Sequence, residues 1–298
     1  MSINIPTHFV QQYSTNVDML LQQKVSKFRR AVTTGSHVGK QASPVDQVGS
    51  IEMQPVTTRF GAMGRVDAPT DRRWVFPSDF DLPQLIDSFD KLKTITDLNS
   101  AYVRNAVAAV NRRFDRSIIA AFLAAAKTGE TGSTSTAFTA ANEVDVAVGG
   151  ANSKINVKKI KAVRELMEAN DVDFEMEEAF IGLTAADHAA LLDEVQIIST
   201  EFRAGQAPVL ESGRVKSFLG FTFVQSELIE TDLAGTNEVT LPVWVKSGMY
   251  LGIWADMQHS VSTRNDLQGE PWQLYTKTSI GATRLEENKV YAIESYRA

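Results

Sequence analysis

The first 80 residues of this chain carry apolar and aromatic side chains, but this segment could not fold alone. Residues 2–50 are polar, and their helix and strand patterns are interrupted. Near the end of this segment lies a turn-rich run from Gly35 to Pro44. Residues 51–60 and 72–76 then alternate like two strands, separated by a long glycine-containing stretch. An isolated two-stranded hairpin is marginal in water, because no second layer covers its faces. We therefore expect arm and hairpin to pack against neighbouring copies, as in an assembly protein rather than an enzyme.

The composition excludes several classes of protein. The length of 298 residues and the hydrophobic content of 43% fit one large globular domain or two ordinary ones. The chain has no cysteine, which rules out a disulfide framework, thiolate chemistry and a Cys-ligated metal site. It starts without the basic and apolar segments of a secretory signal, and no apolar run approaches the roughly 18 residues of a membrane span. We expect a soluble protein, made in the cytoplasm, with no cofactor and no membrane partner.

The net charge of −6 is unevenly distributed. Residues 1–80 contain nine Lys or Arg and six Asp or Glu, so they carry +3 and leave −9 for the remainder. The basic arm of one copy could be attracted to the acidic remainder of a neighbouring copy, although a charge difference of this size also arises by chance. The sequence pI of about 5.4 argues against a dedicated nucleic-acid-binding protein.

The clearest helical pattern runs from about Ser100 to Lys127. At 1.5 Å per residue such a helix is about 40 Å long. Three arginines, Arg104, Arg112 and Arg116, lie largely on its polar side, where they can form surface ion pairs or contact nucleic-acid phosphates. The apolar side chains follow a three-four spacing that places them on one core-facing side: Val103, Val107, Val110, Phe114, Ile118 and Phe122.

The remaining elements predict an α+β fold. A shorter helix is expected from Leu82 to Leu92, with Asp81 as its N-cap and Pro83 in its first turn. After a boundary rich in small residues, Asn156 should cap a helix with a buried stripe, and Thr184 another helix that directly follows a buried strand at 179–183. The C-terminal third is mostly strand, at residues 221–224, 241–246, 259–263, 272–278 and 289–293.

Patterns that could carry catalysis or metal binding are weak. The run from Gly35 to Lys40 is one residue short of a phosphate-binding loop and lacks its Ser or Thr. The four histidines are scattered at positions 8, 37, 188 and 259, and the acidic run at 171–178 lacks the glycine and final glutamate of a calcium loop. No nucleophile elbow, HExxH motif or GxGxxG motif is present. We expect a protein without catalytic or metal-binding residues.

Four segments carry a resemblance to a known family: residues 33–40, 73–77, 217–227 and 270–298. Together with the order of arm, projecting hairpin, long helix, central α/β part and closing sheet, they resemble the major capsid proteins of tailed bacteriophages. The resemblance covers nearly the whole chain, and the order of the elements carries more of it than any single motif.

The resemblance implies the tailed-phage capsid fold. Residues 1–49 would form the N-terminal arm and residues 50–80 the extended β-hairpin loop. Residues 81–135 and 251–298 would form the peripheral domain, with its spine helix at about 100–127, and residues 136–250 the axial domain. Such a chain would self-assemble in the host cytoplasm, through hexamers and pentamers, into the icosahedral shell of the virion. The implied partners are other copies, portal and scaffolding proteins, and double-stranded DNA held by non-specific contacts.

The same resemblance implies that the arm and loop supply the contacts between subunits. The candidate contact residues are Phe9, Tyr13, Phe28, Arg29, Arg30, Met53, Phe60, Arg65, Arg72, Trp74 and Phe76. Deleting residues 1–45 should then leave a soluble chain that fails to close shells. Some shells of this family are cross-linked through a lysine in the loop, but no lysine lies between Lys40 and Lys91 here, so we expect a non-covalent shell.

Three alternatives remain open from the sequence. An encapsulin-type nanocompartment shell shares the fold and packages enzymes instead of DNA. A cytoplasmic oligomeric enzyme with an N-terminal extension would stay a small oligomer. A tail or collar component with swapped arms would form rings or tubes.

Overall fold

The computed structural model of this protein describes residues 22–39, 42–55, 64–86, 98–194, 213–229 and 237–297. Contacts within the chain divide it into two compact units, each built from three separate segments. Unit 1 comprises Met1–Val25, Asp79–Arg113 and Ala255–Ser279, and unit 2 comprises Ser26–Ser78, Phe114–Trp254 and Ile280–Ala298.

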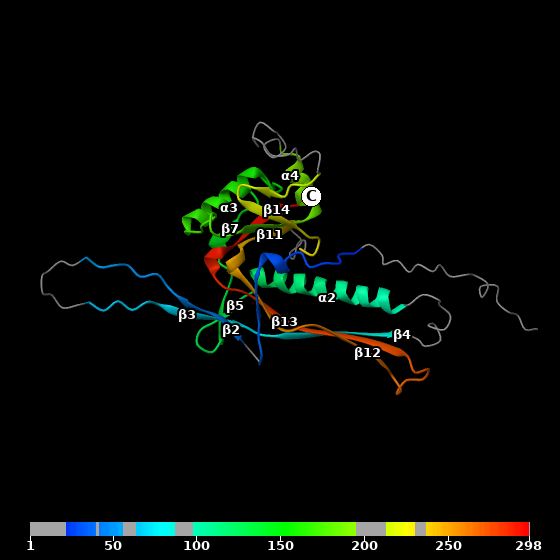
Figure 1. The fold of residues 1–298 in the computed structure, drawn as a ribbon. Helices are drawn as coiled ribbons and strands as arrows, with labels where there is room; N and C mark the ends of the chain where they lie inside the picture. Colours follow the sequence, from blue (N-terminus) through cyan, green and yellow to red (C-terminus); the bar gives the residue numbers. More distant parts are fainter. Residues whose placement is uncertain are drawn as a thin grey trace, which may run out of the picture. The chain divides into compact units, whose positions relative to one another are not determined.

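The largest sheet of the described residues has six strands and belongs to unit 2 (Figure 1). Its strand order is β7-β14-β11-β8-β10-β9. The strands are β7 (Glu143–Val144), β8 (Ala179–Leu183), β9 (Ser217–Phe218), β10 (Phe221–Gln225), β11 (Glu238–Val245) and β14 (Val290–Tyr296). All five residues of β8 are buried, as expected of a continuous apolar run inside a sheet.

Two helices beside this sheet confirm the expected helix, strand and helix order. Helix α3 (Val157–Ala169) and helix α4 (Ala185–Leu192) flank β8 in sequence, and both lie next to the sheet in Figure 1. The side chain of Asn156 accepts a hydrogen bond from the Lys159 amide, and that of Thr184 accepts one from the Asp187 amide. Both caps were predicted, because a short polar side chain preceded each apolar stripe.

The closing strand joins this same sheet. Strand β14 pairs antiparallel with β11 over seven residue pairs, from Glu238 opposite Tyr296 to Trp244 opposite Val290. Strand β11 in turn pairs with β8. The predicted division at 250/251 places β11 and β14 in different domains, whereas the two strands pair in one sheet. Residues far apart in the sequence therefore form neighbouring strands.

Trp244 is the centre of an aromatic cluster in unit 2. Its ring lies 5.6 Å from Phe28, 4.6 Å from Phe122 and 5.6 Å from Phe180, centroid to centroid. Its indole N–H donates to the Ala31 carbonyl oxygen at 2.7 Å, in the short 3-10 helix η2 (Arg29–Ala31). Phe28 is fully buried, so its expected role between subunits is corrected to a core residue. For the same reason a deletion of residues 1–45 would remove part of the core.

Helix α2 (Leu98–Leu123) corresponds to the long helix expected from the sequence, but it ends earlier than Lys127. The guanidinium of Arg284 donates to the carbonyl oxygens of Phe122 and Ala124, which lie at the helix end. The chain then enters strand β5 (Ala126–Thr128). Of the predicted core face, Val110, Phe114, Ile118 and Phe122 are buried, whereas Val103 and Val107 are half-buried.

The helix expected from Leu82 is wrong for residues 82–86. Strand β4 (Ser78–Ile86) occupies this region and forms the edge of a sheet beside β13 (Trp272–Arg284). Burial alternates along it, with Phe80 and Leu82 half-buried and Asp81 and Pro83 exposed. Because an edge strand leaves one row of amides unpaired, it tolerates a proline that lacks an N–H. Residues 87–92 lie outside the described part of the chain.

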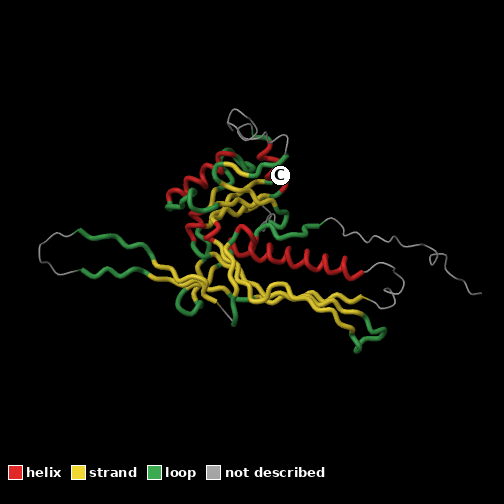
Figure 2. The backbone as a smooth tube through the Cα atoms, in the orientation of Figure 1, coloured by secondary structure: helices red, strands yellow, loops and turns green. Residues whose placement is uncertain are grey.

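The C-terminal segments form strands as predicted, and some are longer. Residues 259–263 are the end of strand β12 (Met249–Thr263), and residues 272–278 the beginning of β13. Strand β1 (Thr33–Ser36) runs parallel to β12, opposite Tyr250 to Ile253. Figure 2 shows strands and a few helices throughout the described chain, so the α+β class is confirmed.

Candidate assembly surface

The hairpin of unit 2 is present, but its first strand lies earlier in the sequence than expected. Strand β2 (Ala42–Val48) pairs antiparallel with strand β3 (Thr70–Val75), in a sheet ordered β2-β3-β5-β6 with β6 at Thr134–Thr136. The amide of Gly49 donates to the Pro69 carbonyl oxygen at 2.7 Å. A Cβ at Gly49 would lie only 2.6 Å from Cγ of Pro69. Residues 51–55, expected in a strand, form no described ladder.

The outer part of this hairpin exposes apolar side chains to solvent. The exposed fractions are 70% for Val48, 60% for Ile51, 100% for Met53 and 46% for Val66. In Figure 1 the hairpin projects away from the other strands of its own unit. Residues 49–55 and 64–67 are exposed throughout. Grouped exposed apolar residues indicate a surface that another molecule covers.

The charged residues of the hairpin pair with each other. Arg72 donates to both carboxylate oxygens of Asp46, at 2.5 and 3.0 Å, across the two strands. This hydrogen-bonded pair raises the pKa of Arg72 further above its ordinary value. Arg65 pairs with Asp67 at 2.7 Å, although its side chain is 85% exposed. Exposed pairs of this kind contribute little to stability. Both arginine side chains are accessible to a partner, because 85% of Arg65 and 41% of Arg72 is exposed.

Other candidate contact residues have partners inside the chain. The Trp74 indole N–H donates to the Gly129 carbonyl oxygen at 2.7 Å, which ties β3 to the turn after β5. Phe76 is 41% exposed. The Arg29 guanidinium lies 4.8 Å from the centroid of the Phe114 ring, and Arg30 is exposed. Phe9, Tyr13 and Phe60 lie outside the described residues.

The base of the hairpin holds residues that the sequence did not single out. Arg73 is 6% exposed and pairs with Glu287, which also pairs with the fully buried Arg284. The alternation in β3 contained a usable signal, because Arg73 is two residues from the buried Val75 and therefore shares its face. Nothing local in the sequence indicated Glu287.

The titratable residues that could suggest catalysis have structural partners. Nε2 of His188 accepts a hydrogen bond from the Val215 amide, and burial, followed by the nearby Arg214, lowers the pKa of His188. The neighbouring Asp187 instead accepts a hydrogen bond from the Ser295 hydroxyl at 2.6 Å. Among the described residues no group of three metal-ligating side chains occurs. In the same residues no helix is long and apolar enough to cross a bilayer.

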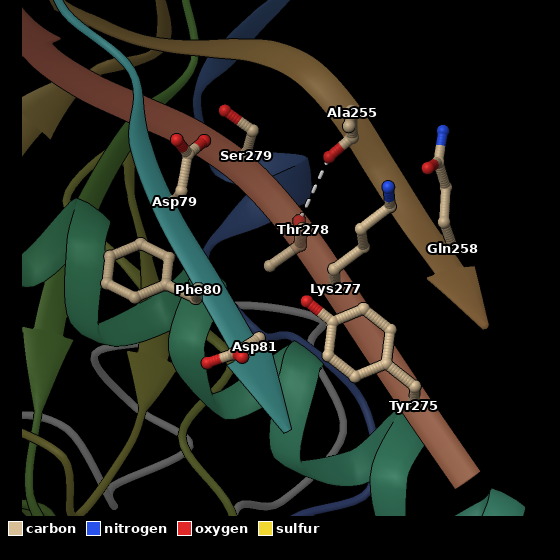
Figure 3. A pocket seen from close by; sticks show the side chains of 9 residues that line it. All are labelled: Asp79, Phe80, Asp81, Ala255, Gln258, Tyr275, Lys277, Thr278 and Ser279. Atoms are coloured by element: carbon tan, nitrogen blue, oxygen red, sulfur yellow. Dashed lines mark hydrogen bonds between the residues drawn. The ribbon is translucent and has the colours of Figure 1, made fainter. Parts of the chain in front are cut away.

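A cavity of about 480 Å³ lies on unit 1 between β4, β13 and β12 (Figure 3). Its lining combines opposite charges with neutral polar groups, and Thr278 donates to the Ala255 carbonyl oxygen at 3.0 Å. No nucleophile is paired with a base among these side chains, so the cavity offers no catalytic arrangement. The lining residues are Asp79, Phe80, Asp81, Ala255, Gln258, Tyr275, Lys277, Thr278 and Ser279.

One family model matches the chain, and solved capsid structures share its fold. Residues 5–296 match the family model described as phage capsid protein. The fold is similar to the capsid structure of cyanophage P-SCSP1u, at 15% identity over 97% of this chain and 93% of that chain, with a TM-score of 0.74. It is also similar to the cyanophage Pam1 capsid, at 10% identity over 99% and 98% of the two chains, with a TM-score of 0.73. No curated protein sequence matches the chain.

Proposed function

The chain belongs to the phage capsid protein family, and from this membership we propose that it assembles through hexamers and pentamers into an icosahedral shell around double-stranded DNA. It has the fold of tailed-phage capsid proteins and is a structural protein of the phage particle, not an enzyme. Assembly takes place in the host cytoplasm, and portal and scaffolding proteins join the shell there.

The exposed hairpin is the structural observation that supports assembly. Its exposed apolar side chains Val48, Ile51, Met53 and Val66 contribute to stability only when a second molecule covers them, by about 25 cal/mol per Å² buried. A neighbouring copy supplies that cover, and repetition over many copies stabilises a shell whose single contacts are weak. The contacts are non-covalent, because residues 41–90 contain no lysine that could form a cross-link.

Contacts with DNA are non-specific and involve phosphates. Arg104 and Arg116 are exposed on α2 and are the candidates for these contacts. Arg112 is a weaker candidate, because it is half-buried.

Electron microscopy of the purified protein tests the proposal, first alone and then after coexpression with the neighbouring genes of its genome. We expect closed icosahedral shells in at least one condition, and DNA inside particles formed in the presence of a portal. A small discrete oligomer in both conditions would contradict the proposal. Closed shells filled with an enzyme would point instead to a nanocompartment.

A further inference from the structure

We propose that Glu287 is a positioning residue that fixes the direction of the hairpin formed by β2 and β3, by holding Arg73 at its base. The consequence for assembly rests on the proposed function, but the effect on the hairpin does not. Figure 1 shows the base of the hairpin at β2 and β3, beside β5 and the end of β13. Glu287 follows β13 by three residues, so it can link the hairpin to the core of unit 2.

Glu287 bridges two guanidinium groups with its two carboxylate oxygens. Oε1 accepts a hydrogen bond from Arg73 at 3.1 Å, and Oε2 accepts one from Arg284 at 2.7 Å. The exposed fractions of the side chains are 7% for Arg73, 16% for Glu287 and 0% for Arg284. An ion pair that is this well shielded from water is costly to break by removing one partner, because the remaining charge stays buried.

The two arginines depend on Glu287 to different degrees. Arg284 also donates to the carbonyl oxygens of Phe122, Ala124 and Thr136, at 2.7, 2.8 and 3.4 Å. The side chain of Arg73 has one further hydrogen bond among the described contacts, to the Gln47 side chain at 3.3 Å. Without the carboxylate, Arg284 therefore stays fixed and its charge repels Arg73. The side chain of Arg73, and with it β3, would move.

Other attachments of the hairpin base hold neighbours of Arg73 and not its guanidinium. The Trp74 indole N–H donates to the Gly129 carbonyl oxygen at 2.7 Å, and Asp71 accepts a hydrogen bond from the Gly129 amide at 3.2 Å. Strand β3 pairs with β5 at two positions, Arg73 with Thr128 and Trp74 with Lys127. On the other strand, Gln47 donates to the Leu285 carbonyl oxygen at 2.6 Å. Gln47 also accepts the hydrogen bond from Arg73, so both strands of the base meet the same cluster. The exposed residues beyond Gly49 follow whatever direction this base imposes.

The chain has no cysteine, so two introduced cysteines would be the only sites of a spin label. We would label Met53→Cys and Lys161→Cys, both exposed positions of unit 2, in the full chain before assembly. The distance distribution between the labels reports the direction of the hairpin. Glu287→Gln should broaden it by roughly twofold, because the base then samples several arrangements. Glu287→Asp, which keeps the charge, should retain most of the narrow distribution.

Arg73→Gln removes the same contact from the hairpin side and carries the test if Glu287→Gln fails to fold. The matched control is Asp46→Asn, which breaks the exposed pair with Arg72 on the hairpin itself and should leave the distribution unchanged. An unchanged distribution in both Glu287→Gln and Arg73→Gln would overturn the inference. A broadened distribution with normal shells would support the inference and contradict the role of the hairpin in assembly.

Discussion

Strand β8 and the outer hairpin belong to the same unit, but they use apolar residues in opposite ways. Every residue of β8 is buried by the chain itself, whereas residues 49–55 of the hairpin are all exposed. Burying a large aliphatic side chain contributes about 1.5 to 3 kcal/mol. The sheet therefore gains its stability within one copy. The hairpin can gain a comparable amount only when another molecule covers it.

The largest expected effect comes from the core side of this comparison. Trp244→Ala removes the ring that contacts Phe28, Phe122 and Phe180, and it leaves the Ala31 carbonyl oxygen without its donor. We expect a loss of about 3 to 5 kcal/mol in the free energy of unfolding, as for other buried aromatic residues. Denaturant unfolding followed by intrinsic fluorescence would measure it. A loss below about 1 kcal/mol would contradict the central contribution of the Trp244 cluster to the stability of the core.

A second effect in the core depends on pH. Lys159 is fully buried, and its ammonium donates to the carbonyl oxygens of Ser153 and Glu294 at 2.7 and 2.6 Å. Burial lowers the pKa of Lys159 from 10.5 to about 8. Between about pH 8 and 10.5 the unfolded chain therefore holds a proton that the folded chain has released. Stability should then rise with pH, by at most about 1.4 kcal/mol per unit.

The comparison of wild type with Lys159→Met isolates this contribution. The wild type should gain stability from pH 8 to pH 10 relative to the variant, as measured by denaturant unfolding at each pH. Parallel stability profiles for the two proteins would contradict the lowered pKa.

A smaller effect is expected at the start of α3. Asn156→Ala removes the side-chain oxygen that accepts a hydrogen bond from the Lys159 amide at 2.9 Å. We expect a loss of about 1 kcal/mol, the usual contribution of an N-cap. The exposed neighbour Lys158 offers a control, because Lys158→Ala should change stability by less than about 0.5 kcal/mol. Equal effects of the two variants would show that the cap contributes nothing.

Elements whose signals are local could be predicted from the sequence. Helix α3, strand β8 and helix α4 combine an unambiguous apolar pattern with a capping residue next to it, and all three lie where expected. Strand β4 was mistaken for a helix because Asp81 and Pro83 imitate a helix start. The two-residue alternation of burial in this strand outweighs that local preference.

Contacts between distant residues could not be predicted. No sequence signal distinguishes Phe28 from the other apolar residues of the polar arm. Its stacking on Trp244 is what makes it part of the core. Arg73 and Glu287 are 214 positions apart, so no periodic pattern links them. The first strand of the hairpin was misplaced because residues 51–55 alternate as a strand would but have no partner strand in the described chain. Met53 is fully exposed, and its contact with another subunit stays a prediction.

The smallest expected effect on stability comes from the hairpin, and it provides the most direct test. Met53→Asp should change the free energy of unfolding by less than about 0.5 kcal/mol, because the side chain is 100% exposed. The same variant should fail to form closed shells in the electron microscope, whereas Met53→Leu, which stays apolar, should form them. Normal shells from Met53→Asp, with unchanged stability, would contradict the claim that this hairpin is an assembly surface.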